Sequence, residues 1–277
     1  MDRKRRILLH PGFRRTGTAS VAAMLAANRA VLEPHLAVLS GADLDPAAAL
    51  CEDFSADLHP LRLADLVETL DALLARHRLA PADGDPRDLL LSSPRLSGLL
   101  PGTPAVPSYE AAPITAAYLA GYFADRFPDA EVALVFTTRS PRAWLQSVWT
   151  AQLAAERLMQ DWTTFSAAYA RAANLDHAVL TTAHAVAPIG VYSLPLEEAA
   201  RHSLGPGGAL LELFDLPGDL RAHLLPGPHA APGPDAALAV TLLDLNRSGL
   251  AKPVLQAEKD RVLRAAAPRR ATSGGTV

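Results

Sequence analysis

The stretch Ile7-Leu-Leu-His-Pro-Gly-Phe-Arg-Arg-Thr-Gly-Thr-Ala-Ser20 decides the fold of this chain. Its first three residues are apolar and predict a short buried strand. Val21, Met24 and Leu25 follow at helical spacing, so we expect a helix to begin near Gly17 or Thr18. The segment therefore predicts a strand, a glycine-containing loop and a helix in direct succession.

Such a loop is a natural site for an anion. Several backbone N–H groups at the start of a helix have no partner within the helix, and the helix dipole adds partial positive charge there. Charged and hydroxyl donors stand at the same place, namely Arg14, Arg15, Thr16, Thr18 and Ser20. The loop is expected to bind a phosphate or a sulfate.

The spacing Gly12-x-x-x-x-Gly17 is shared with the P-loop of nucleoside triphosphatases, but that motif continues with Lys and Ser or Thr. Here Thr18 and Ala19 follow Gly17. The lysine for the β- and γ-phosphates is missing, and alanine cannot ligate Mg²⁺. An ATPase or GTPase is disfavoured, and a nucleotide kinase is the weakest of our hypotheses.

A second anion-binding pattern lies far along the chain. Glu131–Thr138 is apolar and β-branched, which predicts a strand buried on both faces of a parallel sheet. Arg139 stands at its carboxyl end, and Ser140-Pro141 predicts the start of a helix that carries Ser147 about two turns later. The arginine and the serine are placed to converge on one phosphate.

The two patterns together resemble those of sulfotransferases that use 3′-phosphoadenosine 5′-phosphosulfate (PAPS). Arg15-Thr-Gly-Thr-Ala-Ser-Val21 fits the frame of their 5′-phosphosulfate loop, and His10-Pro-Gly-Phe13 looks like bacterial members. Arg139 and Ser147 have the spacing of the family's 3′-phosphate motif. The resemblance implies a three-layer, P-loop-like α/β fold with a mostly parallel central sheet flanked by helices.

The resemblance also implies a function, which is transfer of a sulfonate group from PAPS to a hydroxyl or amine of a small-molecule or glycan acceptor, without a metal. Arg15 would be catalytic, because it would stabilise charge on the leaving oxygen. The expected cofactor-binding residues are Arg14, Arg15, Thr16, Gly17, Thr18, Ala19, Ser20, Arg139 and Ser147.

Two departures from the family pattern motivate a second hypothesis. The family's loop lysine is Arg15 here, and arginine is a planar fork rather than a point donor. Pro94 stands where similar bacterial enzymes carry a glutamate after Ser-Ser. The alternative is therefore a degenerate relative that binds the nucleotide without turnover. Asp43 and His10 are weak candidates for the catalytic base.

Ser92 and Ser93 leave two interpretations open. They end a predicted strand at its carboxyl end, where open α/β sheets bind ligands, so they could line the acceptor pocket. An ordinary turn between strand and loop explains them equally well.

The composition of the chain limits the class of protein and the partners that it can have. The chain has 277 residues, 49% hydrophobic and 20% charged, with a formal net charge of −3 and one cysteine, Cys51. These values predict a globular, cytoplasmic protein without disulfides, and they disfavour nucleic acid as a partner, because no global basic excess is available. No apolar stretch predicts a membrane span or a signal peptide. The sequence gives no indication of the oligomeric state.

One domain is expected over residues 1–267, followed by a disordered tail over 268–277. Further strands are expected at 35–40, 88–92 and 187–194. Helices are expected at 47–58, 61–79, 109–127, 161–175, 236–245 and 250–266, and also at 196–213, where Gly205–Gly208 should interrupt the helix as a turn. Asn246–Leu250 is a weak candidate for a further 3′-phosphate segment.

Overall fold

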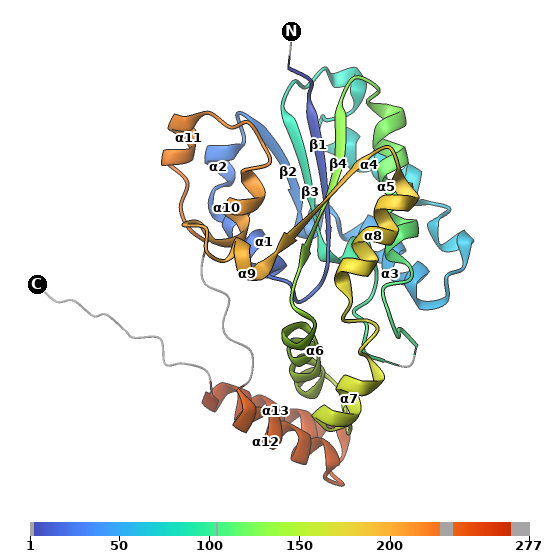
Figure 1. The fold of residues 1–277 in the computed structure, drawn as a ribbon, viewed down its shortest axis with the longest axis vertical. Helices are drawn as coiled ribbons and strands as arrows, with labels where there is room; N and C mark the ends of the chain where they lie inside the picture. The colour runs from blue at the N-terminus through green and yellow to red at the C-terminus, as the bar shows by residue number, and fades with distance from the viewer. Residues whose placement is uncertain (1–2, 104, 228–234, 267–277) are drawn as a thin grey trace, which may run out of the picture. The chain divides into compact units, whose positions relative to one another are not determined.

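A five-stranded parallel sheet forms the centre of the fold (Figure 1). The computed structural model describes residues 3–103, 105–227 and 235–266. Its strands are β1 (Arg6–Gly12), β2 (Leu36–Ser40), β3 (Asp88–Ser92), β4 (Glu131–Thr138) and β5 (Gly190–Pro195), in the order β2-β3-β1-β4-β5. All neighbouring pairs are parallel, which confirms the predicted α/β class.

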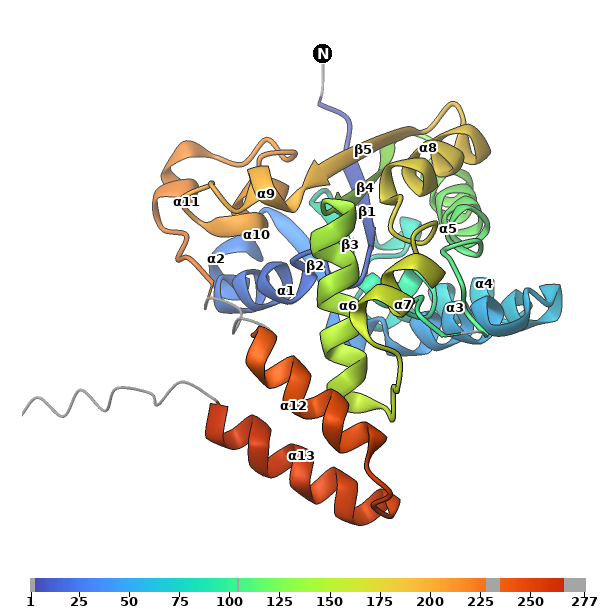
Figure 2. The same cartoon turned by 60° about the horizontal axis from the view of Figure 1, so that its bottom comes forward.

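Helices cover both faces of the sheet, giving three layers (Figures 1 and 2). One face carries α1 (Thr18–Ala27), α2 (Arg29–Leu32), α10 (Gly205–Leu211) and α11 (Gly218–Ala222). The other carries α3 (Asp45–Asp57), α4 (Leu66–Arg76), α5 (Ala112–Arg126) and α8 (Leu175–Val186). Successive side chains of a strand point to opposite faces of the sheet and pack on the helices there. Leu8, Leu90 and Val135, for example, share a core cluster with residues of α1 and α10.

Short helical pieces connect these elements. Four 3₁₀ segments occur in the described chain: η1 (Gly41–Asp43), η2 (Pro60–Leu63), η3 (Pro81–Asp83) and η4 (Pro94–Ser97). The one-turn helix α9 (Leu196–Ala199) follows β5 directly. Because parallel strands all end on the same side of a sheet, the residues that follow β1, β3, β4 and β5 lie together at the carboxyl ends of the strands.

Several helix predictions need correction. The helix expected over 61–79 is divided into η2 and α4, and the one over 161–175 is the shorter α7 (Trp162–Ala168), with α8 unpredicted. Gly205–Gly208 is not a turn but the start of α10. The reason is tertiary: a Cβ on Gly207 would lie 2.8 Å from Met24 Cβ, so the glycine lets α10 pack closely on α1.

The described chain divides into two compact units. The larger unit comprises the described parts of Met1–Leu145 and Tyr169–Ala230, and the smaller those of Gln146–Ala168 and Ala231–Val277. The smaller unit contains the remainder of α6 (Pro141–Ala155), together with α7, α12 (Ala236–Arg247) and α13 (Lys252–Ala266). The tail predicted over 268–277 lies outside the described residues.

Side chains that bind main-chain carbonyls hold the smaller unit together. Asn246 Nδ2 donates to the carbonyls of Leu153 and Leu158 at 3.1 and 3.0 Å. The buried Lys259 Nζ donates to the carbonyl of Glu156 at 2.7 Å. Within the described chain, no helix combines the length and apolar character needed to cross a bilayer.

Candidate anion-binding site

The predicted anion loop joins β1 to α1 and requires glycine at both ends. Gly12 has φ +124°, and a Cβ there would lie 3.0 Å from Pro94 Cα. Gly17 has φ +90°, and a Cβ there would lie 2.5 Å from Leu196 Cδ1. The positive φ values and the close neighbours both exclude a side chain, so the two glycines fix the shape of the loop.

Backbone donors gather at the end of the loop. Helix α1 starts at Thr18, and the N–H groups of Ser20 and Val21 donate to the carbonyl of Gly17. The N–H groups of Thr16, Gly17 and Thr18 have no acceptor among the described residues. Together with the dipole of α1, these donors suit an anion.

Arg139 lies beside this loop. Its Nη1 donates to the carbonyl of Arg15 at 3.3 Å. Partial burial lowers the pKa of Arg15, and the positive charges of Arg139 and Arg14 lower it further. A bound anion would offset this repulsion between like charges. The site is therefore cationic and suited to a negatively charged ligand.

Arg14 is held firmly in place. Its Nη1 donates to Glu52 Oε1 of α3 at 2.9 Å, and its main-chain N–H donates to the hydroxyl of Tyr109 at 3.2 Å. Trp144 Nε1 donates to the Arg14 carbonyl at 3.0 Å. Arg95 Nη2 lies 2.7 Å from Glu52 Oε2. Arg14 thus anchors the loop to three other elements, and its guanidinium already has a carboxylate partner.

Thr16 points away from the expected ligand. Its side chain is fully buried, and its hydroxyl donates to the Phe13 carbonyl at 2.5 Å and contacts Thr137 Oγ1 at 2.6 Å. The hydroxyl is therefore used inside the protein, and Thr16 stays a predicted cofactor-binding residue through its main chain. The main-chain N–H of Thr16 stays available.

His10 continues this buried network. Its Nδ1 lies 2.8 Å from Ser92 Oγ, and its Nε2 lies 3.4 Å from Thr137 Oγ1. Complete burial lowers the pKa of His10 to about 4, so the ring is neutral at pH 7. A histidine with no exposed surface cannot take a proton from an acceptor substrate, so the base hypothesis for His10 is wrong.

The structure also separates the two interpretations of the serine pair. Ser92 is buried against His10, and Ser93 Oγ accepts a hydrogen bond from the N–H of Arg95 at 3.4 Å, at the start of η4. Both side chains therefore serve the turn after β3. Asp43, the other base candidate, forms an ion pair with Arg29 at 3.6 Å, and its Oδ1 lies 3.3 Å from His77 Nε2.

The remaining predicted residues lie as follows. Ala19 and Ser20 belong to the first turn of α1, exposed and half-buried respectively. Ser147 lies on α6, half-buried, in the smaller unit. In the segment 246–250, Asn246 and Arg247 use their side chains on carbonyls within the smaller unit, so this weak candidate gains no support.

Glu197 is a site residue that the sequence analysis missed. It belongs to α9, and its Oε1 accepts a hydrogen bond from the N–H of Ser140 at 3.0 Å, next to Arg139. Glu52 and Tyr109 were missed as well. All three contact the site from positions distant in sequence, and a carboxylate or phenol in a helix or loop has no local pattern that would reveal such a contact.

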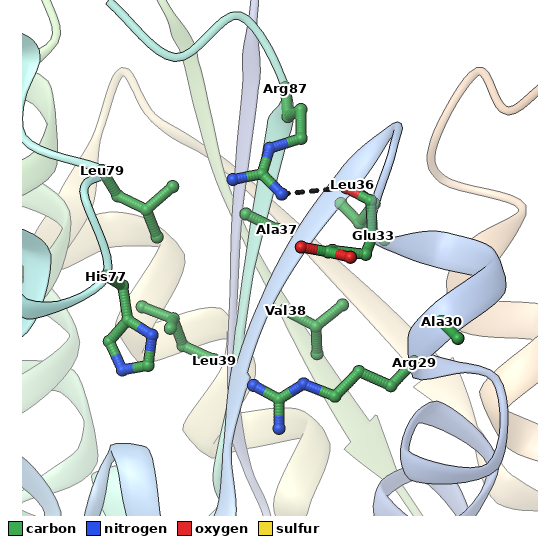
Figure 3. Close-up of a pocket in the computed structure, with 10 residues that line it drawn as sticks. All are labelled: Arg29, Ala30, Glu33, Leu36, Ala37, Val38, Leu39, His77, Leu79 and Arg87. Carbon is green, nitrogen blue, oxygen red and sulfur yellow. Dashed lines mark hydrogen bonds between the residues drawn. The ribbon is translucent and has the colours of Figure 1, made fainter. Parts of the chain in front are cut away.

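A cavity lies along the edge strand β2, away from the anion loop (Figure 3). It measures about 500 Å³, and Leu36–Leu39 line it together with side chains from α2, from the segment after α4, and from Arg87. Arg87 Nη1 donates to the carbonyl of Glu33 across one end. No residue of the anion loop lines this cavity.

The sequence matches no protein-family model, and no curated protein is similar to it. Among solved structures, a sulfotransferase from Alicyclobacillus acidocaldarius is similar, with a TM-score of 0.44, 15% identity, and coverage of 89% of this chain and 97% of that chain. A structure of the PezAT toxin–antitoxin system of Streptococcus pneumoniae is similar with a TM-score of 0.30, 12% identity, and coverage of 92% and 87%. Similarity at this level carries no functional argument, so the function is argued from the site itself.

Proposed function

We propose that this protein is a sulfotransferase that moves a sulfonate group from PAPS to a hydroxyl or amine acceptor. The observation that carries the proposal is the contact between Arg139 and the Arg15 carbonyl, beside loop N–H groups that have no acceptor among the described residues. This arrangement suits a ligand with two anionic groups, one on the loop and one on Arg139.

In the proposed reaction, the acceptor oxygen or nitrogen attacks the sulfur of PAPS. The bond between sulfur and the bridging oxygen breaks, and its electron pair stays on the 5′-phosphate of the leaving nucleotide. Arg15 and the N–H groups of Thr16, Gly17 and Thr18 would stabilise that developing charge. The acceptor's proton passes to a base.

We place the acceptor in a cavity of about 220 Å³ between the segments 108–113 and 171–181, which Tyr109 links to the loop and which no loop residue lines. Tyr109, whose hydroxyl accepts the Arg14 N–H, forms one wall. Glu110 and His177 also line the cavity, and both can take up a proton. This position gives the proposed reaction two candidate bases, in place of His10 and Asp43.

A degenerate relative that binds the nucleotide without turnover is the second candidate. Arg15 replaces the lysine that the family resemblance implies, and Pro94 lies against Gly12, where similar bacterial enzymes carry a glutamate. A planar guanidinium delivers its hydrogen bonds in a different geometry from an ammonium group. Nucleotide binding could persist while transfer is lost.

Release of 3′-phosphoadenosine 5′-phosphate (PAP) from PAPS tests the proposal and separates the two candidates. We expect the wild-type protein to release PAP with water or an added alcohol as acceptor, and Arg15→Ala to abolish the release. If only Arg15→Lys releases PAP, at unchanged nucleotide affinity, the wild-type protein is the degenerate relative. No release by any of the three forms, with no PAP binding, contradicts both candidates.

A further inference from the structure

A fixed negative charge stands beside the arginine that the proposed function assigns to the nucleotide's 3′-phosphate. Glu197 Oε1 accepts a hydrogen bond from the Ser140 N–H at 3.0 Å, and Ser140 directly follows Arg139. Glu197 comes from α9, at the end of β5, so it reaches the site from a separate element. The chain thus supplies its own anion at a place where a ligand anion is expected.

Glu197 belongs to a helix turn that is held against the anion loop. Its neighbour Leu196 packs against Gly17 of the anion loop, which fixes the start of α9 relative to that loop. Desolvation alone would raise the pKa of Glu197. The hydrogen bonds from the Ser140 N–H and from its own N–H, together with the charge of Arg139, outweigh desolvation and lower the pKa. Glu197 is therefore ionised at pH 7.

We propose that Glu197 is a specificity-determining residue, which weakens the affinity of this site for a 3′-phosphate by occupying the Ser140 N–H and part of the field of Arg139. This inference rests on the proposed function, because it concerns the same nucleotide. A phosphate that reaches Arg139 must displace the Glu197 carboxylate or lie next to it. In either case the negative charges of the carboxylate and the phosphate repel each other and oppose binding.

Glu197 can be displaced, because its side chain is exposed and α9 is a single turn. A nucleotide without a 3′-phosphate does not meet this carboxylate. The residue therefore distinguishes between nucleotides by one chemical group. The effect of Glu197 should therefore appear as a difference in affinity between two ligands. If Glu197 only stabilised the start of α6, its replacement would change the folding stability and would leave that difference in affinity unchanged.

Titration calorimetry with PAP and with adenosine 5′-monophosphate (AMP) tests this inference on the full chain. Glu197→Gln removes the charge and keeps an oxygen that can accept the Ser140 N–H. Glu198→Gln is the matched control, since it removes a charge from the adjacent exposed residue of the same helix turn. Thermal unfolding of both variants reports any loss of folding.

We expect Glu197→Gln to bind PAP about tenfold more tightly than the wild type does, and this gain should shrink as the salt concentration rises. Its affinity for AMP should stay within about twofold of the wild-type value. Glu198→Gln should change neither affinity. Equal changes for PAP and AMP, or no change for PAP, would overturn the role of Glu197 and leave the proposed function standing. If no form binds either nucleotide, both the inference and the proposed function fail.

Discussion

Arg139 Nη1 donates a hydrogen bond to the main-chain carbonyl of Arg15 at 3.3 Å, across 124 positions of sequence. The contact exists because β1 and β4 are neighbours in the sheet and end at the same edge. It joins the residue after β4 to the anion loop. A ligand that orders Arg139 should therefore also order the loop, which couples the two halves of the proposed nucleotide site.

We predict that Gly17→Ala destabilises the protein. A non-glycine residue at φ +90° costs about 1–2 kcal/mol, and the new Cβ would meet Leu196 Cδ1 at 2.5 Å. The free energy of unfolding, measured with urea, should fall by at least this amount. Gly218→Ala is the control, because no atom lies within 4 Å of a Cβ there, and its stability should stay within about 0.5 kcal/mol of wild type. Equal stability of the two variants would contradict the prediction.

We predict that His10 makes stability depend on pH between about 4 and 6.5. Burial lowers the pKa of His10 to about 4 in the native state, while the unfolded chain binds a proton near the ordinary value of 6.5. The unfolded state therefore binds more protons in this window, and stability decreases as the pH falls through it. The contribution amounts to about 2 kcal/mol between pH 7 and pH 5.

The measurement is the free energy of unfolding at pH 7 and pH 5 for the wild type and for His10→Asn. Between pH 7 and pH 5 the variant should lose about 2 kcal/mol less stability than the wild type. A parallel decrease in both proteins would show that His10 is not the source.

We predict that Thr16 is structural. Thr16→Val removes the donor to the Phe13 carbonyl and leaves Thr137 Oγ1 with its longer contact to His10 Nε2, and an unsatisfied buried group costs about 1–3 kcal/mol. Thr16→Ser keeps the hydroxyl and should retain most of the stability. Urea unfolding of the two variants gives the comparison. If Thr16→Val is as stable as Thr16→Ser, the buried network does not support the loop.

The sequence predicted the central strands well for a physical reason. Strands β3 and β4 match their predicted bounds, because buried parallel strands are continuous apolar runs between polar turns. Helix α8 was missed: its side chains include two histidines and two threonines, and Leu180 is exposed, so no clear apolar stripe marks the segment.

The site was predicted only where it is local in sequence. The loop and Arg139 follow strands directly, so strand order alone brings them together. Glu197 contacts Ser140 across 57 positions, and Glu52 contacts Arg14 across 38. Tertiary packing sets these contacts, and one sequence carries no signal for them. The direction of the Thr16 hydroxyl was missed as well: it contacts Thr137 on another strand, in addition to the Phe13 carbonyl three residues earlier.

Calorimetric titration with PAP, compared with ATP·Mg²⁺, tests most directly whether this site holds a 3′-phosphorylated nucleotide. We predict micromolar binding of PAP and weaker binding of ATP·Mg²⁺. Arg139→Ala should weaken PAP binding at least about tenfold, since a charge-assisted hydrogen bond is lost, and the exposed Arg142→Ala should not. The absence of PAP binding by the folded protein, or equal binding by Arg139→Ala, would contradict the proposed site.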